Sequence, residues 1–314
     1  MRKIYRTAGK RKLERISATE DGAWISLVAP TDAELTFVAQ RYAIELDDLR
    51  AALDLEERSR ISVEDGYVLI LVDVPTTELR DDRSSYITIP LGIVIAADVI
   101  ITVCSELVSV LADFESGRVS DINTAYRTQF TLQLLLRTAT SYLEALREID
   151  KLIDQGEAAL RRSSRNTELM AMLDLEKSLL YINTSLLSNQ RVLNRIMRTP
   201  SIKKYPEDDE LLHDIVIEYE QAIEVSGIYS SILTGMMDAY ASVIGNNQNL
   251  IMKTLAVATI VMSIPTMVFS AYGMNLNFDG MPGTAPVWGF AVIVLGAFAA
   301  AAIAMVYLFH RKWF

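Results

Sequence analysis

The strongest pattern along the chain is a pair of uncharged hydrophobic segments near the C-terminus, at residues 254–272 and 287–309. At about 1.5 Å of rise per residue, each segment forms a helix long enough to cross a bilayer core roughly 30 Å thick. We therefore predict two transmembrane helices, 250–272 and 287–309, joined by an external loop at 273–286. A buried helical hairpin of a soluble protein is the alternative, but two apolar segments of this length are uncommon in soluble folds.

Basic residues flank the two segments on one side only. Lys253 stands near the start of the first segment, and the tail 310–314 begins His-Arg-Lys, whereas the connecting loop contains no Lys or Arg. The positive-inside rule then predicts that both termini lie in the cytoplasm and that the chain is a multi-pass protein of the plasma membrane. Trp288 and Trp313 fit the two membrane interfaces.

The hydroxyl residues of the first segment lie on one face of the predicted helix. Thr259, Ser263, Thr266 and Ser270 are spaced by four, three and four residues, which places them on one side. A polar stripe inside a membrane faces protein or water rather than lipid. Two interpretations stay open: close helix–helix contact, or a water-filled pore lined by several copies of this helix. Toward the cytoplasm the same stripe continues through Ala256, Met252 and Asn249. It ends at Asp238, an acid that would concentrate cations at a pore mouth.

Upstream of the first span, the hydrophobic repeat continues as one long helix. From Leu212 to Val243, apolar and small residues recur every three or four positions, and Pro206 suits the first turn of a helix. We predict a stalk helix, 206–249, that runs into the first span and reaches roughly 100 Å in total. Because two spans cannot enclose a water-filled path, a pore would require a ring of several copies.

The remaining part of the chain, 1–205, has the pattern of an α+β cytoplasmic domain: an α/β layer followed by helical hairpins. Runs rich in β-branched residues predict strands at 23–29, 67–74, 86–96 and 99–103. Helical patterns occur between and after them, at 31–40, 46–53, 107–115, 123–162 and 167–198.

Charge and composition narrow the classes of function. The chain has 30 Lys and Arg against 40 Asp and Glu, and its formal net charge is −10. A nucleic-acid partner is therefore not expected, because binding to phosphates requires a basic face. Cys104 is the only cysteine, and neither a Cys/His zinc motif nor a nucleotide-binding glycine loop is present. We expect no organic cofactor and no enzymatic activity.

The run Tyr272-Gly273-Met274-Asn275, directly after the first span, resembles the CorA family of magnesium transport proteins. Members carry a Gly-Met-Asn triplet at this place, between two C-terminal spans. The resemblance extends over nearly the whole chain and implies a homopentameric funnel with five first-span helices around the pore. It assigns Gly273, Met274 and Asn275 to the selectivity filter, where carbonyl oxygens accept hydrogen bonds from the water shell of Mg²⁺. The same triplet is also typical of a helix C-terminal turn with Gly and Asn in left-handed conformations.

The resemblance also assigns roles along the pore and reveals one departure. It places Asn249, Met252 and Leu255 near the cytoplasmic constriction, where an apolar ring could gate by dewetting, and Thr266 and Ser270 in the polar lining above. Packing between helices is the alternative role for the apolar pair. Many members have an acid after Met-Pro in the external loop, whereas this sequence reads Met281-Pro282-Gly283-Thr284 and keeps only Asp279.

A regulatory metal site is the further implication. Leu46-Asp47-Asp48-Leu49 resembles a short acidic segment that binds Mg²⁺ together with an acid on the neighbouring stalk, and alignment from Gly-Met-Asn puts Asp214 at that position. Cytoplasmic Mg²⁺ would bridge subunits and hold the pore closed. Solvated surface acids are the alternative interpretation.

The expected function is therefore Mg²⁺ influx down the electrochemical gradient through a channel-type transporter, gated by cytoplasmic Mg²⁺. The expected partners are the lipid bilayer, divalent cations and identical subunits. A transporter of Co²⁺, Ni²⁺ or Zn²⁺ on the same fold is the first alternative. A membrane-anchored sensor is the second, although a helix that serves only as an anchor does not need the hydroxyl stripe.

Overall fold

The computed structural model describes residues 1–8, 12–80, 83–162, 166–199, 202, 206–274 and 288–310. The chain forms two compact units, Met1–Met237 and Asp238–Phe314.

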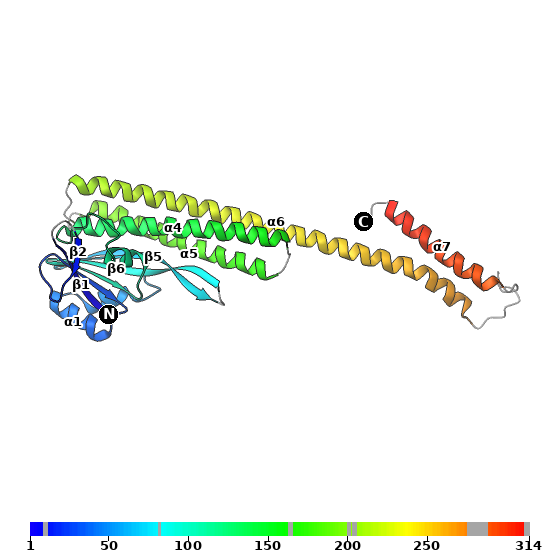
Figure 1. Cartoon of the computed structure of the whole chain (residues 1–314), viewed down its shortest axis with the longest axis horizontal. Coiled ribbons are helices and arrows are strands. Elements are labelled where there is room, and N and C mark those ends of the chain that lie inside the picture. Colours follow the sequence, from blue (N-terminus) through cyan, green and yellow to red (C-terminus); the bar gives the residue numbers. More distant parts are fainter. Residues whose placement is uncertain are drawn as a thin grey trace. The chain divides into compact units, whose positions relative to one another are not determined.

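In the first unit, the described residues form a seven-stranded sheet with the order β2-β1-β3-β7-β6-β5-β4 (Figure 1). The β3–β7 pair is parallel and the other neighbours are antiparallel. The strands are β1 (Arg2–Ala8), β2 (Lys12–Arg15), β3 (Ala23–Val28), β4 (Arg60–Glu64), β5 (Tyr67–Arg80), β6 (Arg83–Ala96) and β7 (Val99–Cys104).

Helices cover both faces of this sheet. The short helices α1 (Asp32–Tyr42) and α2 (Leu46–Ala51) pack on one face, where Thr31 and Glu34 form a capping box that fixes the start of α1. On the other face lie α3 (Ser109–Glu115) and the long helices α4 (Arg127–Arg162) and α5 (Asn166–Arg198), and the ring of Trp24 packs against Phe114 of α3 and Phe130 of α4. Because both faces are covered, β7 is buried along its whole length.

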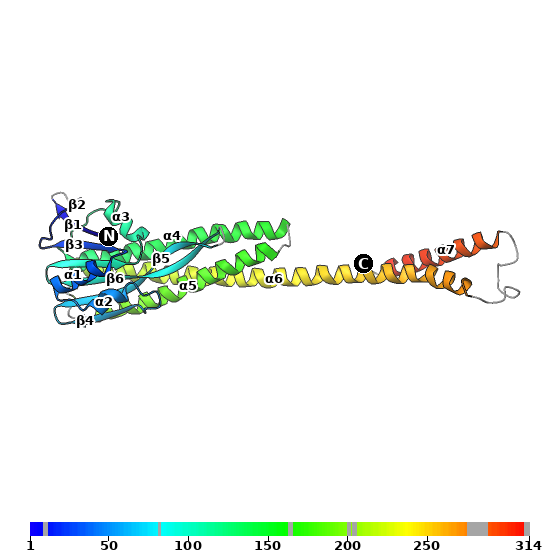
Figure 2. The same ribbon diagram turned by 90° about the horizontal axis from the view of Figure 1, so that it is seen from below.

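The helix α6 (Pro206–Tyr272) begins in the first unit and continues into the second. Its first part lies along α4 and α5, and the three helices run side by side (Figures 1 and 2). The buried residues of this part are mostly apolar and recur every three or four positions up to Ser226, with a last one seven positions later: Leu212, Ile215, Tyr219, Ala222, Ser226 and Leu233. This amphipathic pattern is what holds a stalk helix against its neighbours.

The second unit consists, in its described part, of the rest of α6 and the helix α7 (Gly289–His310). Both helices are long and apolar enough to cross a membrane, by length and composition. The rings of Phe269 and Phe298 lie 6.5 Å apart, so the two helices pack as a pair. Pro265 lies inside α6.

Most predicted elements are confirmed, and the sequence pattern gives the bounds of α6 correctly. Three strands were missed, β1, β2 and β4, because charged residues interrupt their apolar alternation. The strand predicted at 67–74 is too short, since β5 continues to Arg80 as one arm of a long hairpin with β6. The predicted start of the fourth helix is also wrong: residues 124–126 form turns, and α4 begins at Arg127.

Candidate functional site: a hydroxyl stripe on α6

The hydroxyl stripe is on the surface of the second unit. Thr259, Thr266 and Ser270 are exposed, and Ser263 is half-buried. The remaining predicted lining positions on α6 are exposed too: Asn249, Met252, Leu255 and Ala256. Asp238, at the other end of the stripe, is also exposed. One chain therefore leaves this whole face of α6 open.

A second stripe with the same spacing lies on the opposite side of α6. Val257 is buried, and Val261, Ile264 and Val268 are half-buried. This apolar stripe is displaced by two positions from the hydroxyl stripe, which corresponds to about 200° around a helix. Within this unit, α7 is the only other described element, and it buries its small residues Ala297 and Ala301. The structure thus divides α6 into an apolar side for α7 and a hydroxyl side with no partner in the same unit.

The hydroxyl protons of the stripe are used within α6 itself. Thr259 donates to the carbonyl of Leu255 at 2.8 Å, and Thr266 donates to the carbonyl of Met262 at 2.9 Å. Ser263 likewise donates to the carbonyl of Ile260 at 2.8 Å. Each of these oxygens keeps its lone pairs, so the stripe presents hydrogen-bond acceptors to whatever lies in front of it. Acceptors are the groups that bind the outward-pointing hydrogens of a hydrated cation.

At the end of α6, Gly273 closes the last helical turn. Its N–H donates to the carbonyls of Phe269 at 2.9 Å and Ser270 at 3.2 Å. Gly273 is not among the described glycines with positive φ, so the expected left-handed conformation is wrong at this position. The bond to Phe269 spans four residues, as in an α-helix, so Gly273 continues the hydrogen-bond pattern of α6 by one residue. A side chain at Gly273 would meet that same carbonyl at 3.2 Å.

The filter and loop predictions can be followed only in part. Met274 is 55% exposed at the end of the helix. The other predicted residues of the loop and the tail lie outside the described residues: Asn275, Asp279, Met281, Pro282, Gly283, Thr284, Arg311, Lys312 and Trp313.

The predicted regulatory acids have different surroundings. Asp48 accepts a 2.7 Å hydrogen bond from the Tyr67 hydroxyl and lies 3.6 Å from the guanidinium of Arg60. Burial raises the pKa of Tyr67 to about 12, and the hydrogen bond to Asp48 adds to the rise. Asp47, in contrast, is 94% exposed beside Arg50, and Asp214 is exposed on α6.

No group of three or more His, Cys, Asp or Glu that could hold a metal ion occurs in the described part of the chain. No sequence pattern predicts Arg60 and Tyr67 as partners of Asp48. Arg60 belongs to β4, a strand that the sequence pattern did not predict. Tyr67 opens a recognised strand, but its side chain meets Asp48 only in the folded sheet.

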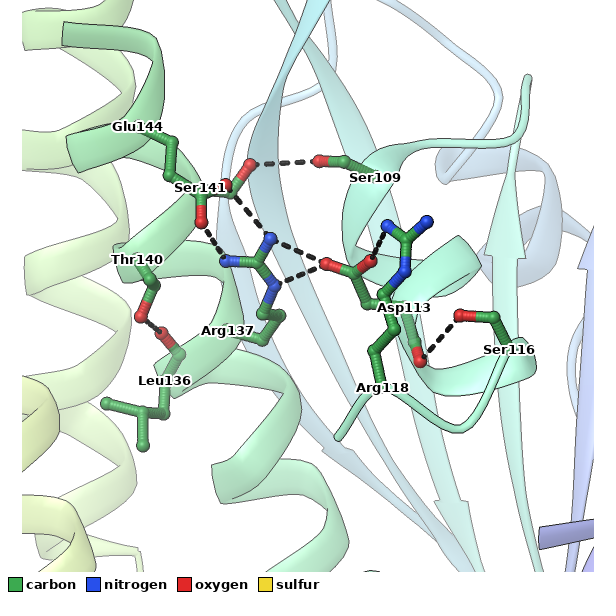
Figure 3. Close-up of polar contacts among 9 residues, drawn as sticks. All are labelled: Ser109, Asp113, Ser116, Arg118, Leu136, Arg137, Thr140, Ser141 and Glu144. Carbon is green, nitrogen blue, oxygen red and sulfur yellow. Dashed lines mark hydrogen bonds and ion pairs between the residues drawn. The ribbon is translucent and has the colours of Figure 1, made fainter. Parts of the chain in front are cut away.

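A charged cluster between α3 and α4, which no sequence pattern predicts, is the other polar feature of the first unit (Figure 3). Arg137 of α4 donates from Nε to the buried Asp113 of α3 at 2.6 Å and forms a two-pronged contact with Glu144 at 2.9 Å. Arg118 reaches Asp113 from the other side at 2.9 Å. Figure 3 also shows the hydrogen bond between Ser109 and Ser141 beside this cluster. The cluster fixes α3 against α4 and compensates the charge of Asp113.

Comparison with known proteins places these features in a family. A family model described as CorA-like Mg²⁺ transporter protein matches residues 19–311. A cobalt/magnesium transport protein CorA from Methanocaldococcus jannaschii is 27% identical over 298 residues, covering 92% of this chain and 90% of the relative. A magnesium transport protein CorA from Helicobacter pylori is 20% identical over 301 residues, with 92% and 90% covered.

Solved structures share the fold. The complete structure of the CorA magnesium transporter from Methanocaldococcus jannaschii matches with a TM-score of 0.83 at 23% identity, covering 100% of this chain and 99% of that chain. The full-length CmaX protein matches with a TM-score of 0.68 at 14% identity, covering 98% and 96%. Since the family model spans almost the entire sequence, both candidate spans included, this chain belongs to the family of CorA-like Mg²⁺ transporter proteins.

Proposed function

We propose that the protein is a channel-type transporter that carries Mg²⁺ into the cell across the plasma membrane, down the electrochemical gradient. The observation that carries this proposal is the acceptor stripe of α6, which faces away from α7 and is open in the single chain. The family match and the names of the relatives support Mg²⁺ as the cargo, with Co²⁺ as a second ion to test. At about 100 mV inside negative, entry of a divalent ion is favoured by about 4.6 kcal/mol, so no ATP site is required.

The pore needs several copies of the chain. Each chain contributes one stripe, and a closed ring of stripes would surround a water-filled axis that lipid does not reach. By family resemblance the ring is a homopentamer. The hairpin of the two spans puts both termini on the same side of the membrane, and Lys253, Arg311 and Lys312 favour the cytoplasm.

The chemistry of the stripe suits a hydrated ion. Mg²⁺ gives up water reluctantly and prefers octahedral oxygen coordination. Hydroxyl oxygens whose own protons are bound to α6 can accept hydrogen bonds from the ion's water shell without replacing it. We assign Gly273, Met274 and Asn275 to the outer filter and Met252 and Leu255 to an apolar constriction. Asn249 and Asp238 then lie toward the cytoplasmic mouth.

We further propose that cytoplasmic Mg²⁺ closes the pore by bridging neighbouring subunits. The acids are Asp47 or Asp48 of one chain and Asp214 of the next. Asp48 would have to exchange its contact with Arg60 for the metal, whereas Asp47 and Asp214 are exposed. A ligand that binds the closed ring better shifts the population toward it, and removal of the ion lets the ring open.

The decisive experiment is flux of Mg²⁺ into liposomes that contain the purified protein, with valine in place of single threonines. Thr266→Val removes an acceptor from the stripe at nearly constant volume. Thr254→Val is the matched control, because Thr254 donates to Leu250 in the same way but lies off the stripe. We expect Thr266→Val to change the Mg²⁺ flux or the extent to which Co²⁺ inhibits it. Thr254→Val should leave both quantities as in the wild type. Equal behaviour of the two variants would contradict the assignment of the stripe.

The same assay decides between cargoes. Competition by Co²⁺, Ni²⁺ and Zn²⁺ at equal concentrations shows which ion the pore prefers. Absence of flux for all four ions, with the protein folded and inserted, would favour a membrane-anchored sensor instead.

A further inference from the structure

A polar cluster around Asp73 joins five parts of the first unit. Tyr142, Asn189 and Tyr219 are fully buried, whereas Asp73 and Ser59 are half-buried. Asp73 lies on β5 beyond the last residue that pairs with β4, so its backbone has no strand partner on that side. The side-chain amide of Asn189 on α5 takes the place of a strand. It accepts from the Asp73 N–H at 2.9 Å and donates to the Asp73 carbonyl at 2.8 Å. The Tyr142 hydroxyl of α4 donates to the same carbonyl at 3.0 Å. These bonds fix the main chain of Asp73 and therefore the point from which its side chain projects.

The carboxyl group of Asp73 meets hydroxyls rather than a cation. Ser59, just before β4, donates to its Oδ2 at 3.1 Å. The Ser185 hydroxyl of α5 also acts on this carboxyl group, although its own hydrogen bond goes to Thr88 at 2.8 Å. No Lys, Arg or His in the described part of the chain forms an ion pair with it. Arg58, next to Ser59, is exposed, and Arg60 pairs with Asp48 and Glu57. An ionised carboxylate here lacks the partner that buried charges normally require.

The stalk helix reaches this cluster through Tyr219. The ring of Tyr219 is fully buried, and its centroid lies 6.5 Å from that of Tyr142. Its hydroxyl has no hydrogen-bond partner of normal geometry among the described residues, although Asn189 lies near it. Burial raises the pKa of Tyr219, and the negative charge of Asp73 raises it further. The two tyrosines are the titratable groups that face Asp73 from α4 and α6, while α5 contributes only neutral side chains.

We propose that Asp73 is a proton-dependent contact for the stalk helix: α6 packs firmly on α4 and α5 while the carboxyl group carries a proton, and ionisation loosens residues 212–226 of α6. A neutral acid fits in this half-buried place beside Ser59 without a cation. An ionised one is stabilised by water, and movement of α6 away from the cluster would give it more. Because α6 continues as one helix into the first candidate span, such a contact would act on the helix that carries the stripe.

The direction of the pH effect follows from linkage. Burial raises the pKa of Asp73 above its ordinary value, and the Ser185 and Ser59 hydroxyls oppose this rise. The packed state therefore holds the proton more tightly than an opened state in which Asp73 meets water. Packing of α6 is strongest below the ordinary pKa of an aspartic acid. As the pH rises toward the pKa of Asp73 in the packed state, this packing weakens. The equilibrium constant for opening of α6 then rises by up to about tenfold per pH unit.

Hydrogen exchange of the full-length protein tests this inference without reference to the transported ion. Opening of residues 212–226, corrected for the intrinsic pH dependence of exchange, is measured between about pH 4 and pH 8. We expect it to increase with pH in the wild type and to be independent of pH in Asp73→Asn, which mimics the neutral acid. Asp65→Asn is the control, because Asp65 lies in an exposed turn, and it should keep the wild-type dependence.

Two results would overturn the proposal: a wild type without pH dependence, or the same dependence in Asp73→Asn. Should Asp73→Asn fail to fold, Ser59→Ala provides an independent readout. Ser59→Ala removes a hydroxyl that favours the ionised form of Asp73. The pH range over which the packing of α6 weakens should therefore extend further upward. An unchanged or lower range in Ser59→Ala would contradict the role of Asp73.

Discussion

Tyr67 and Asp48 are joined by a 2.7 Å hydrogen bond from the phenol to Oδ2, and Arg60 approaches the other oxygen of the same carboxylate at 3.6 Å. Asp48 is thus already bound within its own chain. If it also binds cytoplasmic Mg²⁺, the metal and the guanidinium compete for one group.

This competition predicts that Arg60→Gln makes the proposed gate more sensitive. Arg60 is partly exposed, so its attraction for Asp48 is worth about 1 kcal/mol, or roughly a fivefold change in affinity. We expect Mg²⁺ flux in liposomes to stop at about fivefold lower internal Mg²⁺ than in the wild type. Arg58→Gln, an exposed neighbour, should leave the closing concentration unchanged. If Arg60→Gln needed a higher internal Mg²⁺ concentration for closing, the assignment of Asp48 to the proposed regulatory site would be wrong.

Gly92 of β6 sits where no side chain fits. A Cβ atom at this position would lie 2.6 Å from the Cβ of Ala52, and neither atom can rotate away. We expect Gly92→Ala to lower the free energy of unfolding by about 1–3 kcal/mol, because the sheet and the segment after α2 must separate. The measurement is thermal or denaturant unfolding of the first unit, Met1–Met237.

Gly227→Ala is the matched control for this change. Gly227 lies inside α6 with open space around the position of a Cβ. Alanine is the better helix former, so this variant should be neutral or more stable by up to about 1 kcal/mol. Equal destabilisation by both variants would show that backbone freedom, and not the contact with Ala52, decides the effect.

Arg137 holds the buried charge of Asp113, as Figure 3 shows. The Arg137→Gln variant would leave the Asp113 carboxylate with only Arg118, whose side chain is 77% exposed. We expect a loss of about 2–4 kcal/mol in the free energy of unfolding. Glu144→Gln removes only the outer, half-exposed contact of the same guanidinium and should cost less than about 1 kcal/mol. If the free energy of unfolding falls by the same amount in both variants, the contact between Arg137 and the buried Asp113 is not the source of the stability.

The sequence predicted α6 well because its start, its repeat and its end all carry clear signals, although Pro265 lies inside the helix. Pro206 starts it, an apolar repeat runs through it, and the Gly273 turn ends it. The outer half of the β5–β6 hairpin could not be recognised in this way. Thr76 and Thr77 follow a proline and have no apolar alternation, and their strand structure comes from pairing with Ile87 and Tyr86 of β6.

For the site, the sequence predicted the stripe but not its surroundings. Periodicity places Thr259 and Ser263 on one face, whereas only the packed hairpin shows that α7 covers the opposite one. Likewise, an acidic pair in the sequence indicates a metal site, yet the neutralising Arg60 comes from a strand whose charged residues concealed it. Contacts between distant segments depend on the fold, and local pattern does not contain them.

Cys104 should be unreactive while the protein is folded. Its thiol is fully buried on β7, donates to the Pro90 carbonyl at 3.4 Å, and has its pKa raised to about 11 by burial. At pH 8 both access and the thiolate fraction are therefore low. We expect maleimide labelling only after unfolding, while a Leu79→Cys variant, at a position that is 74% exposed, should label at once. Rapid labelling of Cys104 in the native protein would show that β7 opens locally.

The filter assignment can be tested with two asparagines of the same loop. Asn275 and Asn277 differ by two positions, and only Asn275 belongs to the Gly-Met-Asn triplet. Asn275→Ala removes a ring of neutral oxygen acceptors from the proposed outer entrance, and the ion's water shell then loses hydrogen bonds that the bulk solvent does not replace. We expect the preference for Mg²⁺ over competing divalent ions to fall about tenfold, equivalent to ~1.4 kcal/mol. Asn277→Ala, made in the same background and assayed in the same liposomes, should keep the wild-type preference. If Asn275→Ala transports and discriminates like Asn277→Ala, the triplet is a helix-ending turn and the filter lies elsewhere along the stripe.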